Sequence, residues 1–266
     1  MDLWFFAYLA LGAFAGFFAG LLGIGGGGIM VPVLAMLFAA QGMPDAHLMH
    51  LALGTSMATI MFTSISSLRA HHAHGAVLWP VVRALAPGVL LGTFLGAQLA
   101  ARLPTVPLAV IFALFMSYVA LQMVLNVKPK PARQLPGSLG MFGVGTGIGG
   151  ISALVAIGGG AVTVPFLAWC NVRLHHAIGT SAAVGFPIAL AGSVGYLAAG
   201  HAAEGLPAGS LGFVHLPALA STAIASVLLA PLGARAAHRL PVAALKKVFA
   251  LLVVLLVAKM LYSLLA

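Results

Sequence analysis

Long apolar runs recur along the whole chain of 266 residues and constrain its fold more than any other feature. Most are about twenty residues long, enough to cross a hydrocarbon core of roughly 30 Å as an α-helix. With 62% hydrophobic and only 6% charged residues, the chain cannot hide its apolar surface as a water-soluble globule. The runs therefore predict an all-α, polytopic transmembrane helical bundle, and we treat residues 1–266 as a single domain.

Eight runs are long enough to be full-length helices, and two are too short to span alone. The first run follows Asp2 without a positively charged region before it, which favours a mature helix over a signal peptide. The short segments are expected near 29–41 and 161–171, each directly after a glycine-rich turn that breaks the helix. The full-length helices are expected near residues 3–22, 47–68, 77–101, 106–127, 137–156, 176–199, 211–235 and 242–265.

The charged and metal-binding side chains exclude several classes of protein. The net charge of +9 is spread over short loops without a basic stripe, so no nucleic acid is expected as a partner. Cys170 stands alone, which excludes an intramolecular disulfide and predicts a small buried hydrophobe. His71, His72 and His74 could hold a metal, but beside Arg69 in an expected loop they are more typical of interfacial residues. We expect no metal and no cofactor.

A glycine-rich phrase occurs twice, 133 residues apart, as Gly25–Pro32 and Gly158–Pro165. The duplication extends to a Gly-Thr-Ser motif, Gly54–Ser56, which is answered by Gly179–Ser181. These matches predict two internal repeats, at about 1–127 and 136–266. The polar linker 128–135 joins them, and its prolines forbid helix. Further matched pairs are Gly75 with Gly200, Gly96 with Gly233, Arg102 with Arg239, and Leu103-Pro104 with Leu240-Pro241.

The orientation of the repeats depends on whether each short helix completes a crossing with its glycine loop. If it is re-entrant, the repeats run parallel and the basic residues divide evenly. If it completes a crossing, one side keeps only Arg102, Lys259 and all three acidic residues, and the positive-inside rule favours this second count. We therefore expect inverted repeats with both termini outside the cytoplasm. The other side then collects Arg69, Arg83, Lys128, Lys130, Arg133, Arg173, Arg235, Arg239, Lys246 and Lys247.

The two glycine clusters are the strongest candidates for a binding site. Non-helical backbone at membrane depth is tolerated where it lines a cavity, and a helix that starts there points free N–H groups and a positive dipole end into it. Pro32 and Pro165 fit the first turns of such helices. Neighbouring hydroxyls would add donors for a small anion. The predicted substrate-binding residues are Gly25, Gly26, Gly27, Gly28, Thr55, Ser56, Gly158, Gly159, Gly160, Thr180 and Ser181.

Other glycines and hydroxyls have simpler explanations. The Gly12, Gly16, Gly20 ladder and the Gly88, Gly92, Gly96 ladder have the four-residue spacing of close helix packing. The hydroxyls of Thr55, Ser56, Thr59 and Thr63 could also bond to carbonyls of the preceding turn of their own helix.

Enzymatic readings find little support. Gly23, Gly25 and Gly28 have dinucleotide-site spacing, but no soluble strand precedes them. No G-x-S-x-G elbow is present, so an intramembrane hydrolase is a distant alternative. Asp2, Asp45 and Glu204 all fall in loops or at the terminus, which leaves no carboxylate relay inside the helices. We expect a protein that is not an enzyme.

The doubled glycine turn followed by proline, the paired Gly-Thr-Ser motifs, His74-Gly75 and Gly92-x-x-x-Gly96 resemble the TauE/SafE family of sulfite and organosulfonate exporters. The resemblance covers essentially the whole chain, although Ala199 stands in the second repeat where the first has His74. It implies a transporter of sulfite, sulfonates such as sulfoacetate, or thiosulfate in the bacterial inner membrane, working by alternating access around a midplane site. An anion channel for other small oxyanions or carboxylates is the alternative, and the flux direction, coupling ion and oligomeric state stay open.

Overall fold

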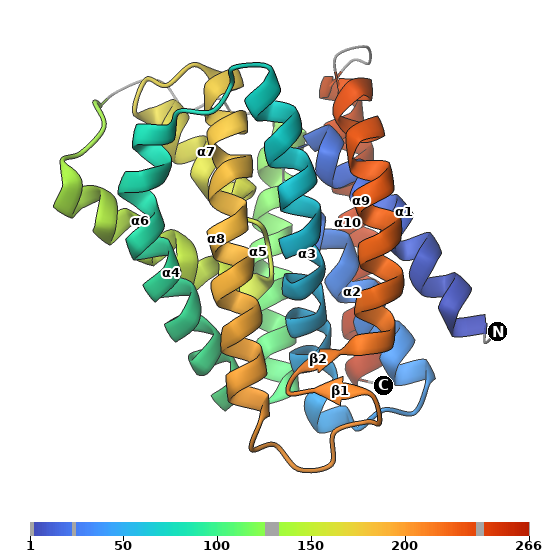
Figure 1. The fold of residues 1–266 in the computed structure, drawn as a ribbon. Coiled ribbons are helices and arrows are strands. Elements are labelled where there is room, and N and C mark those ends of the chain that lie inside the picture. The colour runs from blue at the N-terminus through green and yellow to red at the C-terminus, as the bar shows by residue number, and fades with distance from the viewer. Residues whose placement is uncertain (1–2, 23–24, 126–132, 238–241, 266) are drawn as a thin grey trace.

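The computed structural model describes residues 3–22, 25–125, 133–237 and 242–265. Among these residues, eight helices are long and apolar enough to cross a membrane. The protein is therefore a polytopic helical bundle, as predicted (Figure 1). The linker expected at 128–135 lies largely outside the described residues. The helices are α1 (Leu3–Leu22), α2 (Gly27–Ala40), α3 (Leu48–Ala73), α4 (Trp79–Arg102), α5 (Thr105–Leu125), α6 (Ser138–Val155), α7 (Gly160–Trp169), α8 (Leu174–Gly200), α9 (Leu216–Ala237) and α10 (Val242–Leu265), with a short 3-10 turn at Asp45–His47 before α3.

Two predicted boundaries were wrong. Helix α3 continues to Ala73, so Arg69, His71 and His72 lie on its last turns and not in a loop. The segment expected as helix from residue 211 instead begins with an antiparallel hairpin of β1 (Ser210–Leu211) and β2 (Val214–His215). The hairpin turns at Gly212, whose φ of 52° lies in the left-handed region that glycine adopts readily.

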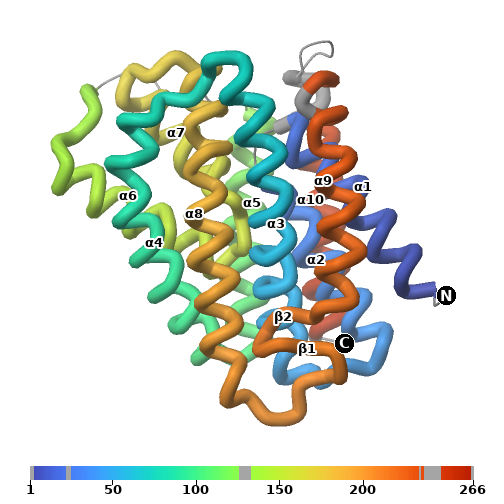
Figure 2. Tube along the Cα trace, viewed as in Figure 1, coloured from blue at the N-terminus to red at the C-terminus, as the bar shows by residue number. Residues whose placement is uncertain are grey.

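Helices α3 and α8 form the centre of the bundle. The apolar window of α3 is 83% buried, against 39% for α1, because α3 is enclosed by other helices while α1 faces lipid. Figure 1 and the tube in Figure 2 show α3 beside α8, with α4 and α6 on one flank and α9 and α1 on the other. The two central helices carry the two Gly-Thr-Ser motifs.

The flanking helices are exchanged between the sequence repeats. Helix α1 packs against α9, and α4 packs against α6, in each case across the repeat boundary. A Cβ at Gly12 would lie 2.4 Å from the carbonyl oxygen of Thr222, and one at Gly92 would lie 2.0 Å from that of Thr146. The predicted packing role of the glycine ladders is thus confirmed for these positions. We call α1, α2, α3 and α9 the first bundle, and α4, α6, α7 and α8 the second bundle.

Corresponding helices point in opposite directions in the view of Figure 1. Helices α3 and α9 run away from the end that carries the β1–β2 hairpin, whereas α8 and α4 run toward it. We call this end the hairpin end. Asp45 before α3, Arg102 at the end of α4 and Glu204 after α8 lie there, while Arg69 and Arg173 lie at the opposite end. This is the directionality that inverted repeats require, and the inverted relation itself stays a prediction.

Candidate functional site

The two glycine phrases form the same backbone turn. Gly26 caps the start of α2 with φ 77° and ψ −12°, and Gly159 caps the start of α7 with φ 78° and ψ −14°. Both lie in the left-handed region, where an L-residue with a side chain is disfavoured by roughly 1–2 kcal/mol. Two segments 133 residues apart in sequence therefore start a short helix in the same way.

The two turns touch each other inside the bundle. A Cβ placed on Gly25 would lie 2.8 Å from the amide nitrogen of Gly158, and one placed on Gly158 would lie 3.2 Å from the Cα of Gly25. Gly25 and Gly158 are equivalent positions of the duplicated phrase, so each copy contacts its counterpart. The side chain of Ile60, on α3, reaches both turns. We call this contact the glycine junction.

The helices that leave the junction offer amide donors. The carbonyl of Gly26 accepts from the amides of Ile29 and Met30, both at 3.1 Å. The carbonyl of Gly159 accepts from Val162 at 3.1 Å and from Thr163 at 2.7 Å. The first two amides of each helix precede any carbonyl that their own helix can supply. These amides belong to Gly27 and Gly28 in α2, and to Gly160 and Ala161 in α7.

The threonines of the two Gly-Thr-Ser motifs join the repeats. The Oγ1 of Thr55 accepts from the amide of His215, directly before α9, at 2.9 Å. The Oγ1 of Thr180 accepts from the amide of Leu78, directly before α4, at 3.0 Å. Each threonine thus binds the start of a helix that belongs to the other sequence repeat.

The serines beside them are different. Ser56 and Ser181 are both fully buried, and neither Oγ has a hydrogen-bond partner. Ser56 lies one turn before Ile60 on α3, and Ser181 lies one turn before Gly185 on α8. A Cβ at Gly185 would lie 2.9 Å from the carbonyl oxygen of Gly158, so both serines stand one turn from residues that contact the junction.

Thr163 joins this group, although it was not predicted as a site residue. Its side chain is fully buried, its Oγ1 has no partner, and this oxygen would lie 3.3 Å from a Cβ on Gly159. The equivalent residue of the first phrase is Met30, so the polar group is present in one copy only. A position-by-position comparison of the two phrases reveals this threonine, whereas a search for residues that the two phrases share does not.

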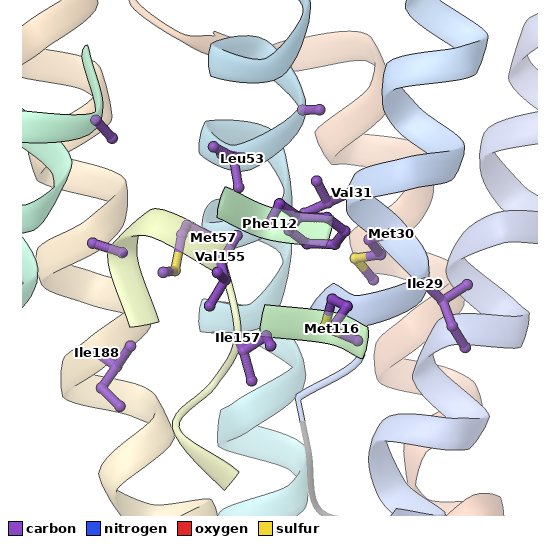
Figure 3. Close-up of a cluster of buried hydrophobic side chains, with 14 of the residues drawn as sticks. Ile29, Met30, Val31, Leu53, Met57, Phe112, Met116, Val155, Ile157 and Ile188 are labelled. Carbon is purple, nitrogen blue, oxygen red and sulfur yellow. The ribbon is translucent and has the colours of Figure 1, made fainter. Parts of the chain in front are cut away.

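Apolar side chains surround the junction. Figure 3 shows Leu53 and Met57 of α3, Val155 and Ile157 before α7, and Ile188 of α8 among the cluster. An unpaired hydroxyl costs about 1–3 kcal/mol in such surroundings. The arrangement therefore combines positive helix ends and unpaired hydroxyls among apolar side chains, a set of donors that can bind a small group that accepts hydrogen bonds.

The structure therefore separates the predicted site residues into groups. The two glycine phrases meet at the junction, and Ser56 and Ser181 lie one helical turn from residues that contact it, while the Oγ1 atoms of Thr55 and Thr180 face helix starts. The substrate-binding role of all eleven residues stays a prediction.

Comparison with known proteins agrees with this architecture. The chain is 39% identical over 254 residues to a "Probable membrane transporter protein" of Haemophilus influenzae, covering 95% of this chain and 96% of the relative. It is 28% identical over 193 residues to "Probable membrane transporter protein YdhB" of Bacillus subtilis, covering 70% of this chain and 76% of the relative. No solved structure matches the chain.

The family profile described as Sulfite exporter TauE/SafE matches residues 8–260, which is nearly the whole chain. Family and relatives are membrane transporters and not enzymes. The chain belongs to the TauE/SafE family and is a multi-pass membrane transporter.

Proposed function

We propose that the protein carries a small sulfur-containing oxyanion, such as sulfite, sulfoacetate or thiosulfate, across the bacterial inner membrane. The observation that carries the proposal is the glycine junction, where two helix starts meet and three unpaired, fully buried hydroxyls lie on it or one helical turn from residues that contact it. The family name points to sulfite, and the donor chemistry fits an oxyanion. The hydroxyls belong to Ser56, Thr163 and Ser181.

The donors of this site can bind an anion and still release it. Amide and hydroxyl groups stabilise negative charge through hydrogen bonds, and the helix N-termini add a positive dipole end. No lysine or arginine occurs in the phrases or the Gly-Thr-Ser motifs, so no fixed charge would trap the anion there. A negative-inside membrane potential would favour export by about 2.3 kcal/mol per charge per 100 mV.

The position of the junction suits alternating access. Gly25 follows α1 and precedes α2 in the first bundle, whereas Gly158 lies between α6 and α7 in the second. A substrate held between them would be exposed to one side or the other as the two bundles rock, in the manner of inverted-repeat transporters. An anion channel with the same donors is the alternative. Counterflow of labelled sulfite against unlabelled sulfite in liposomes occurs with a carrier and not with a channel.

The variant Gly159→Ala tests the site. The added methyl would lie 2.4 Å from the terminal carbon of Ile188, a flexible neighbour, and 3.3 Å from the Oγ1 of Thr163. We expect folding to tolerate it and saturable sulfite flux in liposomes to fall at least about tenfold, which corresponds to about 1.4 kcal/mol.

Gly42→Ala is the matched control, because Gly42 has φ 71° but no atom within 4 Å of its added Cβ. It carries the same backbone strain away from the junction, so its flux should stay at the wild-type level. Equal flux in the two variants would contradict a site at the junction.

A further inference from the structure

A cavity lies at the hairpin end of the bundle, outside the glycine junction. Its volume is about 370 Å³, near the lower end of the roughly 300–1,000 Å³ typical of ligand pockets. The 3-10 turn before α3 supplies His47, the start of α3 supplies His50, the end of α4 supplies Arg102, and the hairpin turn supplies Phe213. The remaining wall is mostly alanine, from the 3-10 turn, the end of α4, the end of α8 and the loop after it. Three cationic or titratable side chains thus line one small cavity.

The two imidazoles are held by backbone carbonyls. The Nε2 of His50 lies 3.0 Å from the carbonyl oxygen of Leu103, and the Nε2 of His47 lies 3.1 Å from that of Glu204. Because a carbonyl only accepts, each Nε2 carries a hydrogen, and Nδ1 of a neutral ring is then an acceptor. Both Nδ1 atoms are buried without a partner, and His50 is only 3% exposed. Each ring therefore keeps one unused hydrogen-bonding atom, which is closed to the cavity in this conformation and reaches a ligand only when the ring turns.

These groups match a ligand with two properties. The guanidinium of Arg102 carries a positive charge and can bind an oxyanion. The Nδ1 of a neutral imidazole can accept a hydrogen bond from a hydroxyl. The carboxylates near this end, on Asp45 and Glu204, disfavour a ligand with high negative charge. A metal ion fits less well, because the described residues hold no group of three metal-ligating side chains.

The cavity lies beside the first Gly-Thr-Ser motif. The carbonyl oxygen of Phe213 would lie 2.1 Å from a Cβ on Gly54, and the ring of Phe213 lies 4.9 Å from that of His50. Two residues on, the amide of His215 binds Thr55, which precedes the unpaired Ser56. The segment Phe213–His215 therefore contacts both the cavity and the first Gly-Thr-Ser motif.

We propose that this cavity is a second anion-binding site, a vestibule for a small oxyanion that still carries a proton, such as hydrogen sulfite. Arg102 binds the negative oxygen, and the imidazoles of His47 and His50, once their rings turn toward the cavity, accept the hydrogen bond from the hydroxyl. The vestibule gathers the anion at the hairpin end before or after it occupies the junction, and to that extent it rests on the proposed function.

Sulfite flux in liposomes of uniform orientation tests the vestibule. Arg102→Gln should raise the KM for sulfite offered at the hairpin end about tenfold, through loss of a charge-assisted hydrogen bond, and leave kcat within about twofold. The KM for sulfite offered from the opposite end should not change. Arg83→Gln is the matched control, because Arg83 lies at the other end of the same helix and outside the cavity. An unchanged KM in Arg102→Gln, or an equal rise from both ends, overturns the proposal.

The variant His50→Gln tests the hydrogen bond. Its amide NH₂ can still donate to the carbonyl of Leu103, but its one acceptor, the amide oxygen, no longer lies at the position of Nδ1. Methanesulfonate, which accepts hydrogen bonds and donates none, should then compete with sulfite more effectively than in the wild type, and unchanged competition contradicts the role of the imidazoles. His47→Gln repeats the test if His50→Gln does not fold. Wild-type protein without saturable sulfite flux refutes the proposed function, whereas normal flux with no effect of Arg102→Gln refutes the vestibule alone.

Discussion

At the scale of single residues, adjacent hydroxyls of one motif have different environments. Thr55 and Thr180 accept hydrogen bonds from buried amides, whereas Ser56 and Ser181 are equally buried and unpaired. A buried polar group without a partner lowers the stability of the fold and persists where a ligand can use it. The serines are therefore the hydroxyls that we assign to the substrate.

This difference predicts opposite effects on stability and transport. In Ser56→Ala and Ser181→Ala an unpaired buried hydroxyl is removed, so the melting temperature in detergent should stay equal or rise. Sulfite flux in liposomes should nevertheless fall at least about tenfold in the double variant, because two donors worth about 1 kcal/mol each are lost. A lower melting temperature with normal flux would show that the serines are structural.

The sequence singled out the glycines that meet at the junction, but it did not separate the contacts of neighbouring hydroxyls. Duplication singled out the glycines and both Gly-Thr-Ser motifs, because equivalent positions share residue types. It could not separate Thr55 from Ser56, since that difference depends on the amide of His215, which lies 160 residues away. Thr163 was missed because its counterpart is Met30.

At the scale of helices and strands, the repeats are joined through the starts of their long helices. Thr55 on α3 binds the amide directly before α9, and Thr180 on α8 binds the amide directly before α4. The neighbouring glycines allow this approach, since a Cβ at Gly179 would lie 2.6 Å from the carbonyl oxygen of Ala76. Gly54 is placed in the same way against Phe213.

These contacts predict a stability cost when the threonine oxygen is removed. Thr55→Val and Thr180→Val would each leave a buried amide without its acceptor, which costs about 1–3 kcal/mol. Thermal unfolding in detergent should show a lower melting temperature for both variants. Thr146→Val is the control, because the half-buried Thr146 donates to the carbonyl of Phe142 in its own helix. A control as unstable as the two variants would rule out the capping role.

The helices themselves were largely predictable, because apolar runs of membrane length mark spans without any knowledge of contacts. The hairpin was not, since a run that includes Leu211, Phe213 and Val214 reads as membrane helix until the left-handed Gly212 and the start of α9 at Leu216 are seen. The exchange of α4 and α9 between the repeats was also beyond the sequence, because the glycine ladders predict close packing but not the partner helix.

At the scale of the whole molecule, the sequence repeats and the packed bundles are different units. The first bundle takes α9 from the second repeat, and the second bundle takes α4 from the first. If transport requires two bodies to rock, the exchange makes the bundles the moving bodies, and the main contact between them is that of α3 with α8. The glycine junction then lies between the bodies, as alternating access requires.

Paired cysteines distinguish the bundles from the repeats as moving units, in a background with Cys170→Ala. In Thr63→Cys with Ser226→Cys, the bridge joins α3 to α9 within the first bundle, where the two hydroxyl oxygens lie 2.7 Å apart. In Met57→Cys with Gly192→Cys, the bridge joins α3 to α8 between the bundles, where a Cβ on Gly192 would lie 3.1 Å from the Cγ of Met57. Oxidation should leave sulfite flux intact in the first pair and stop it in the second, with recovery on reduction. If the repeats were the moving units, the first bridge would also join two moving bodies and stop transport. The sulfite flux of the first pair after oxidation therefore distinguishes moving bundles from moving repeats.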